Sequence, residues 1–432
     1  MTNTHPVDER IGAGRLAVLG LQHVLVLYAG AVAAPVVLAA GLGLSTADLV
    51  YLVATDLLLC GLGTLLQSLG VWQVGVRMPM VLGAAFTSVA PMLVIAQGHD
   101  IRTMYGSLLV SGVFMALAAP LFARLLRFFP PVVMGTAITL IGIQLVPVAA
   151  GMVAGHSPAA PGFGSPGAIG LALLVVLVIV AVHRFLPRLR QLAFLVGLLA
   201  GTAVAIALGQ VNLGAVVQGP VLGFPEPFHF GLPSFDLAAT LSLIIIQIVI
   251  MVECAGQVQA IGAAVDKPVG PSDVAASLRA DGLITMLASV FQSFMYVTYA
   301  QNIGMVSVTK VRSRYVTAVA GAIALVLSFF PFMGRIVAVV PQPVLGGAAL
   351  VMVATVAMVG IRILSTVDLQ DNRNLVIVAV SLGIGLLPTV QPAFYTQFPP
   401  SAQLFLTSSV ATGTVVAFLL NLLLRPTSQA KD

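Results

Sequence analysis

Four ionisable side chains lie inside long apolar runs of this chain: His23, Asp56, Glu253 and Asp281. Placing such a group at membrane depth costs about 2.5–3.5 kcal/mol or more, so each is a candidate functional residue. Glu253 follows the nearly pure hydrocarbon run 243–252 and has no basic neighbour in sequence. A carboxyl group there is costly to bury as an anion and cheap to bury when protonated. It is therefore suited to couple proton movement to the binding of a polar ligand.

The other three ionisable residues have ordinary structural explanations that compete with a functional one. A neutral, hydrogen-bonded packing residue explains His23 as well as a binding role does. Asp56 is more typical of a polar contact between helices. Asp281 either pairs with the nearby Arg279, caps backbone groups, or serves a site.

Two apolar segments are interrupted, and the interruptions point to a binding site. Residues 79–86 and 296–304 are extended, β-tolerant stretches, and each leads into a short apolar run. Broken helices offer unwound backbone and positive helix N-termini to a polar ligand. Two kinked helices that only pack together would explain the breaks but would give Gln301 and Asn302 no purpose at mid-membrane.

The elements that hold these residues are predicted to be membrane-spanning helices. Of the 432 residues, 59% are hydrophobic and 8% are charged, against about a quarter charged in soluble domains. In a bilayer only helices and closed barrels satisfy every backbone polar group. A barrel would show alternating segments of about ten residues, whereas the apolar runs here are continuous and often exceed about seventeen residues. The fold class is therefore predicted to be an all-α polytopic membrane protein.

Composition also argues against several functions. The two cysteines, Cys60 and Cys254, cannot form a disulfide framework or a metal cluster. A membrane enzyme would need a nucleophile–base pair or a metal set, which the scattered Cys and His residues do not supply. The net charge of +5 is spread over many short loops, so nucleic acid is not an expected partner. The sequence predicts a protein that is not an enzyme and uses no metal.

Hydropathy and charge together predict the topology. With the N-terminus inside, the positive-inside rule places all but Arg102 and Arg335 of the 19 Lys and Arg residues on the cytoplasmic side. The long outside loop 209–236 contains neither Lys nor Arg. We expect a multi-pass protein of the cytoplasmic membrane with both termini in the cytoplasm. Fourteen hydrophobic segments are predicted, with the third and tenth short, centred near residues 28, 58, 88, 112, 141, 175, 199, 247, 286, 304, 323, 350, 381 and 414.

An internal similarity indicates that the chain is a repeat. Residues 130–137 (PPVVMGTA) resemble residues 341–348 (PQPVLGGA), an offset of about half the chain. Fourteen spans divide into two halves of seven, and because seven is odd the second half enters the membrane inverted. A 7+7 inverted repeat usually places the substrate site at the interface of the repeats, near mid-membrane.

A ten-residue motif in the second interrupted segment carries a family resemblance. Residues 301–310 (QNIGMVSVTK) match the pattern Gln or Glu, Asn, any, Gly, four of any, Thr, then Arg, Lys or Gly. This pattern is the signature of the nucleobase–ascorbate transporters, the second nucleobase:cation symporter family, which the chain resembles from about residue 21 to 387. The supporting motifs are Gln22-His23, the strand 83–86, Glu253 and Ala280-Asp281-Gly282.

The resemblance implies an architecture and a mechanism. Family members have fourteen spans, short strands in broken segments 3 and 10, and two domains that move as an elevator, typically in a homodimer. Their cargo is a small-molecule nucleobase carried across the lipid bilayer with a co-transported proton and no other cofactor. By position, the core domain would comprise 16–125 (spans 1–4) and 236–333 (spans 8–11), and the gate domain 126–210 (spans 5–7) and 336–426 (spans 12–14).

The resemblance also implies roles for particular residues. Glu253 and Gln301 would bind two polar edges of the base, and Asp281 would join Glu253 in proton coupling. The base would also meet the Phe86 ring, and backbone groups near Phe86 and Ala300 would add hydrogen bonds. The remaining implied residues are Tyr299, Gln257 and His23 at the substrate, with Asn302, Gly304 and Thr309 shaping the tenth span.

One position favours a substrate, and a few positions depart from the family pattern. Uracil-type members tend to carry Glu where this chain has Gln301, and an amide that both donates and accepts suits an oxidised purine. We therefore expect proton-coupled import of xanthine or uric acid. Gln257 stands where many purine members have Asp, and Ala84 and Ala85 replace the usual Thr or Ser. A uracil or other pyrimidine permease, and an uncoupled or sodium-coupled carrier, stay open as alternatives.

Overall fold

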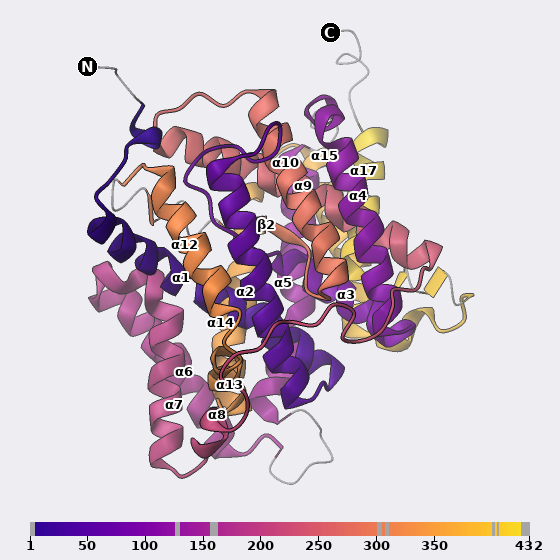
Figure 1. Ribbon diagram of the computed structural model, residues 1–432. Helices are drawn as coiled ribbons and strands as arrows, with labels where there is room; N and C mark the ends of the chain where they lie inside the picture. Colours follow the sequence, from indigo (N-terminus) through magenta and orange to yellow (C-terminus); the bar gives the residue numbers. More distant parts are fainter. Residues whose placement is uncertain are drawn as a thin grey trace.

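Long apolar helices make up most of the chain in the computed structural model, which describes residues 5–125, 130–155, 163–299, 305–306, 311–399, 402–403 and 406–424 (Figure 1). Within these described ranges, three short 3₁₀ helices lie among them, at Pro6–Asp8, Pro187–Leu192 and Pro392–Tyr395. The other elements are α1 Ala13–Leu42, α2 Thr46–Leu69, β1 Leu82–Ala84, α3 Phe86–Gly98, α4 Ile101–Leu125, α5 Pro131–Ala154, α6 Pro166–Phe185, α7 Ala193–Ala207, α8 Gly214–Val217, α9 Leu237–Ala264, α10 Pro271–Val290, β2 Tyr296–Thr298, α12 Arg314–Leu327, α13 Phe332–Ala338, α14 Gln342–Leu364, α15 Asn372–Val390 and α17 Ser409–Leu423.

Local sequence signals fix where several helices begin. Ser45 and Asp48 form a reciprocal capping box at the start of α2. Asp236 accepts a hydrogen bond from the backbone of Ala239 and so caps α9. Pro130 and Pro341 occupy the N-cap positions of α5 and α14, each with proline again in the first helical residues.

The helices fall where the hydrophobic segments predict them. Every predicted span centre lies within a helix except that near residue 304, which is outside the described residues. In the described part of the chain, eight helices are long and apolar enough to cross a membrane, and the α12–α13 pair, bent by 81°, would make a ninth. The apolar helices α3, α7 and α17 have only 13, 15 and 15 residues. The polytopic helical fold is thus confirmed, while the count of fourteen spans stays a prediction.

A small antiparallel sheet lies in the buried interior, and it confirms strands in both interrupted segments. Leu82 pairs with Thr298 and Ala84 with Tyr296. The pairing continues beyond the strands, because the Ala85 amide donates to the carbonyl of Met295 over 2.7 Å. All strand residues are buried. The sheet therefore lies in the interior, surrounded by helices, where it joins two chain segments about 210 residues apart.

Helices α5 and α14 pack against each other in opposite directions through small residues near both ends. A Cβ atom on Gly135, near the start of α5, would lie 3.0 Å from the carbonyl oxygen of Gly360 near the end of α14. A Cβ on Gly346, near the start of α14, would lie 2.6 Å from the amide of Val153 near the end of α5. Both glycines belong to the internally similar octapeptides, so equivalent residues make equivalent contacts.

Two further helix pairs cross through glycine and join the halves of the chain. Helix α2 packs on α12, where a Cβ on Gly61 would lie 2.6 Å from the amide of Leu325. Helix α4 packs on α10, where a Cβ on Gly282 would lie 2.7 Å from the amide of Ala116. Such close backbone approach is the usual way in which membrane helices gain packing contacts.

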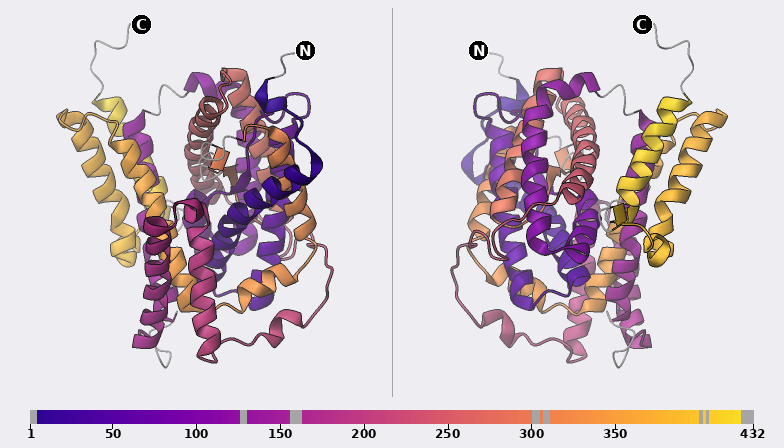
Figure 2. Two further views of the ribbon diagram at one scale, coloured as in Figure 1. Left: turned by 90° about the vertical axis from the view of Figure 1, so that its left-hand side faces the viewer. Right: turned by 90° about the vertical axis from the view of Figure 1, so that its right-hand side faces the viewer.

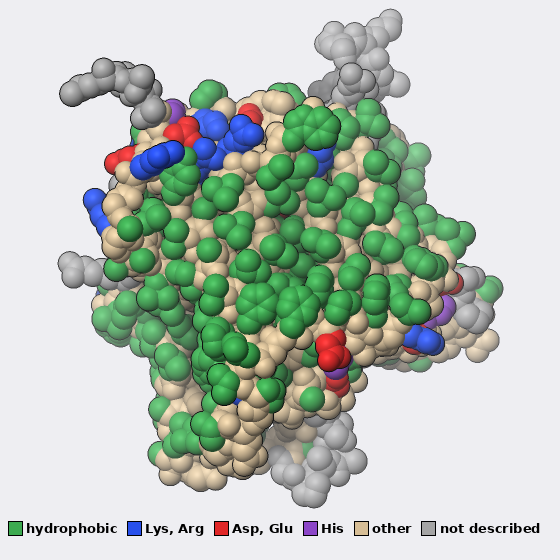
Figure 3. Space-filling view, viewed as in Figure 1, with side chains coloured by type: hydrophobic (Ala, Val, Ile, Leu, Met, Phe, Trp, Pro, Cys, Tyr) green, Lys and Arg blue, Asp and Glu red, His purple; other side chains and the backbone are tan. Residues whose placement is uncertain are grey.

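The ends of the described chain lie on the same side of the molecule (Figures 1 and 2). On the face seen in Figure 3, Lys and Arg side chains gather near that end, while hydrophobic side chains cover the middle. This distribution agrees with the sign of charge expected at a cytoplasmic surface.

Candidate functional site

Helix α9 places Glu253 and Gln257 one turn apart on the same face. The Gln257 amide donates to Glu253 Oε1 over 3.1 Å. Among the described residues, Glu253 Oε2 and Gln257 Oε1 are buried and have no hydrogen-bond partner. Leaving such an acceptor unsatisfied costs about 1–3 kcal/mol, and more for a charged group. Both oxygens are therefore buried acceptors that N–H or O–H donors beyond the described contacts would satisfy.

Asp281 of α10 is held by a residue that sequence reasoning missed. Gln67 of α2 donates through one nitrogen to Asp281 Oδ1 over 2.7 Å and to the Oγ of Ser277 over 2.9 Å. The Cys254 thiol, next to Glu253 in sequence, lies 3.4 Å from the same Ser277 hydroxyl. Arg279 donates instead to the carbonyl of Gln73, so the suggested Arg279–Asp281 pair is not among the described contacts. Asp281 thus joins α2, α9 and α10, and its Oδ2 has no described partner.

The N-terminus of α3 begins directly after β1. Phe86 is the first helical residue and is half-buried, and the preceding Ala85 provides no side-chain cap. Thr87, in the first turn, is buried, and its hydroxyl has no partner in the described chain. Polar backbone groups and the Phe86 ring are therefore available together at one end of the sheet, as the broken-helix prediction requires.

Tyr299 follows β2 and packs between two glycines. A Cβ on Gly83 would lie 2.2 Å from the ring, and one on Gly30 of α1 would lie 2.5 Å from it. The Tyr299 hydroxyl donates to the carbonyl of Ala84 over 3.3 Å, and its amide donates to the carbonyl of Val81 over 2.9 Å. The Tyr299 side chain therefore contacts both β1 and α1 and connects them to the end of β2.

Asp56 makes a helix-to-strand contact. The hydroxyl of Tyr296, in β2, donates to Asp56 Oδ1 over 2.6 Å, and the same hydroxyl lies 2.9 Å from the Oγ of Ser293. The Cys60 thiol, one turn along α2, lies 3.5 Å from the same carboxyl oxygen. The structural interpretation of Asp56 as a polar packing residue fits these contacts, although its partners come from a strand and not from another helix.

Several other predicted residues are less informative. His23 is buried in α1. Ala300, Gln301, Asn302, Gly304 and Thr309 lie outside the described residues, so their predicted roles stay predictions. The only sequence signal for Gln67 was an amide inside the apolar run of α2, which does not identify a partner 214 positions away.

Comparison with known proteins gives consistent matches along the chain. The profile of a family described as "Permease family" matches residues 14–394. The chain is 38% identical to the uric acid permease PucJ of Bacillus subtilis over 409 residues, covering 94% of this chain and 91% of that protein. It is 37% identical to the xanthine permease of Bacillus subtilis over 426 residues, covering 98% of this chain and 96% of that protein.

Among solved structures, the fold is similar to the transmembrane domain of the cyanobacterium bicarbonate transporter BicA. The TM-score is 0.63 at 14% identity, covering 96% of this chain and 98% of that one. At this identity the likeness concerns the fold, and it supports a polytopic membrane architecture.

Proposed function

Because the chain belongs to the nucleobase–ascorbate transporter family of permeases, we propose that it imports an oxidised purine nucleobase, xanthine or uric acid, together with a proton. Family membership makes the chain a transporter and not an enzyme. The names of its relatives support an oxidised purine as cargo, and so does an amide in place of a carboxylate at position 301.

The observation that carries the proposal is the pair of buried acceptors on α9 that have no partner among the described residues. An oxidised purine presents N–H groups beside carbonyl oxygens on the edges of a flat ring. Glu253 Oε2 and Gln257 Oε1 are two neighbouring buried acceptors that such N–H donors would satisfy. In this arrangement the Gln257 that departs from the family pattern becomes part of the site, because its amide orients Glu253.

Five further residues would surround the base. Phe86, at the start of α3, would lie against the flat face of the ring. Backbone groups near Phe86 and Ala300 would bind its polar atoms, and Gln301 would bind the edge opposite Glu253. His23 would assist from α1, while Tyr299 would hold the strands in register beneath the base.

Proton coupling follows from the burial of the carboxyl groups. Burying an anionic Glu253 in apolar surroundings without a neighbouring cation costs much more free energy than burying its neutral, protonated form. A proton taken up from outside would therefore accompany binding of the base, held by Glu253 before the base donates to Oε2 and by the linked Asp281 afterwards, and release of base and proton inside would reset the site. Asp281 shares the Gln67 amide with Ser277, whose hydroxyl lies 3.4 Å from the Cys254 thiol, and in this proposal it would share the proton of Glu253 or set its affinity.

The helix packing supports an inverted 7+7 repeat and two moving domains. In a 7+7 repeat, α2 corresponds to α10, α4 to α12 and α5 to α14. The α2–α12 contact therefore corresponds to the α10–α4 contact, and the α5–α14 contact corresponds to itself. Helices α5, α6, α7, α14, α15 and α17 pack mainly with one another, and so do the helices around β1 and β2. Figure 2 shows α15 and α17 lying apart from the second group. We assign the first group to the gate (126–210 and 336–426) and the second to the core (16–125 and 236–333).

In this proposal the core carries the base across the membrane against the gate, as an elevator. The protein would lie in the cytoplasmic membrane with both termini inside, and it would form a homodimer as family members do. The basic side chains near the end that carries both described termini support this orientation.

Uptake by energised cells tests the proposed function. Cells that express the chain would be given labelled xanthine, urate or uracil, with and without a protonophore. We expect accumulation of one oxidised purine that collapses when the proton gradient is removed. Uracil accumulation would contradict the assignment from position 301, and flux that ignores the proton gradient would favour a sodium-coupled or uncoupled carrier.

A further inference from the structure

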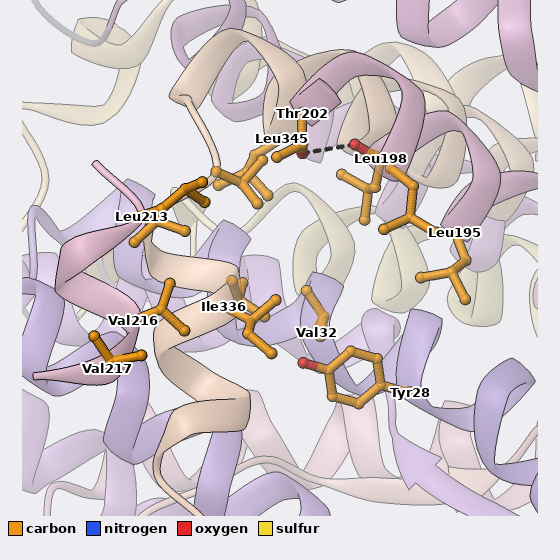
Figure 4. A pocket seen from close by; sticks show the side chains of 14 residues that line it. Tyr28, Val32, Leu195, Leu198, Thr202, Leu213, Val216, Val217, Ile336 and Leu345 are labelled. Carbon is orange, nitrogen blue, oxygen red and sulfur yellow. Dashed lines mark hydrogen bonds between the residues drawn. The ribbon is translucent and has the colours of Figure 1, made fainter. Parts of the chain in front are cut away.

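A cavity of about 360 Å³ lies at one edge of the molecule, away from the polar site on α9. Its walls come from α1, α7, α8, α13 and α14 (Figure 4). In the proposed domain assignment it separates part of the core from part of the gate. A nucleobase would find no partner there, because the lining is almost entirely aliphatic.

The two hydroxyl groups in the cavity wall are already satisfied. Thr202 donates to the carbonyl of Leu198 over 2.7 Å, and Tyr28 donates to the carbonyl of Met333 over 2.9 Å. A cavity of this kind stays free of water and takes apolar guests, and one of about 150 Å³ already accepts benzene. The chemistry of the lining therefore selects a hydrocarbon.

The cavity opens on the outer surface of the molecule, between the apolar helix α7 and α8 of the loop 209–236, which the predicted topology places at the outer end of the spans. Leu199 of α7 and Val217 of α8 line it and are 60% and 80% exposed. Deeper in the same wall, Val32, Val337 and Leu345 are only 3%, 4% and 4% exposed. The hydrocarbon next to the open side of a membrane-spanning helix is a lipid tail. The cavity thus offers a lipid tail access to Val32, Val337 and Leu345, which lipids on the outer surface of the protein do not contact.

We propose that this cavity binds one acyl chain of a membrane phospholipid. The chain enters between α7 and α8 and ends against α1, α13 and α14. Filling the space restores the dispersion contacts that its aliphatic walls otherwise lack. The bound chain also occupies the gap between two groups of helices, so it sets their spacing on this side of the molecule.

Photolabelling in nanodiscs tests the proposal. The probe is a phosphatidylglycerol with a diazirine near the end of one acyl chain, and labelled residues are mapped by peptide mass spectrometry. We expect label on the buried residues Val32, Val337 and Leu345, with none on the equally buried Val353 of α14, which does not line the cavity. Label confined to outward residues such as Leu199 would overturn the proposal.

A matched pair of variants tests the same point independently. Thr202→Phe places a ring in the cavity, whereas Thr355→Phe places it on the exposed face of α14. Both threonines donate to the carbonyl four residues earlier over 2.7 Å. Because the ring occupies space that the acyl chain needs, Thr202→Phe should lower the label on the buried residues at least about fivefold, and Thr355→Phe should not. An equal loss in both variants would overturn the proposal, and the labelling of the unsubstituted protein decides the matter if Thr202→Phe does not fold.

Discussion

Replacing Gln67 by leucine tests whether the buried network positions Asp281. The change removes the nitrogen that lies 2.7 Å from Asp281 Oδ1 and 2.9 Å from the Ser277 hydroxyl. Hydrogen bonds to charged groups are worth about 1.5–3 kcal/mol in soluble proteins. Contacts between membrane helices average about 0.6 and reach about 1.7 kcal/mol. The short distance and full burial favour the upper end of the membrane range, so we expect a coupling of about 1.5 kcal/mol, a tenfold change in the unfolding equilibrium.

A double-mutant cycle measures that coupling. The wild type, Gln67→Leu, Asp281→Leu and the double variant would be unfolded reversibly in mixed micelles and followed by circular dichroism. Gln97→Leu is the matched control, because the Gln97 amide donates over 2.9 Å to the carbonyl of Gly41 in an exposed position. Gln67 and Asp281 should show the full coupling, while the control should cost little. Single-variant effects that add within about 0.5 kcal/mol would refute the account of Asp281 as held by Gln67.

Three further predictions follow from the described contacts. Glu253→Gln keeps an acceptor oxygen but cannot carry a proton, so accumulation of the base should stop while exchange of base across the membrane continues; undiminished accumulation would contradict the assigned role. Gly112→Val should lower the melting temperature, because its Cβ would lie 2.7 Å from the backbone amide of Met286, whereas Gly151→Val, with open space around it, should not; equal shifts would refute the packing argument. Arg314 donates to Asp8 and to the backbone carbonyls of Ser68 and Leu69, so Arg314→Ala should speed hydrogen exchange in the last turn of α2, where a cation stabilises the helix end by about 0.3–1 kcal/mol; unchanged exchange there would argue against that role.

Much of the helical fold could be predicted from the sequence, because in a bilayer the backbone forces apolar runs into helices. The two strands could also be located, because residues 79–86 and 296–304 interrupt apolar runs with β-tolerant residues. The octapeptide similarity predicted equivalent positions, and Gly135 and Gly346 do make equivalent contacts. These features are local in sequence or repeated along it.

The polar contacts could not be predicted, because they join residues far apart. Nothing in the sequence links Gln67 to Asp281 or Asp56 to Tyr296, at separations of 214 and 240 positions. The cavity beside α8 also arises from packing, and not from a sequence period. Glu253 was identifiable as a lone carboxyl group in hydrocarbon, but its bond with Gln257 required the helix geometry to be known.

The proposed function requires that this chain, without another protein, couples a proton to the movement of an oxidised purine. Purified protein in liposomes, with an imposed pH gradient (alkaline inside) and no sodium, tests it most directly. We expect labelled xanthine or urate to accumulate above its external concentration and to leak out again when the gradient is dissipated. Equilibration without accumulation, or accumulation that requires a sodium gradient instead, would contradict it.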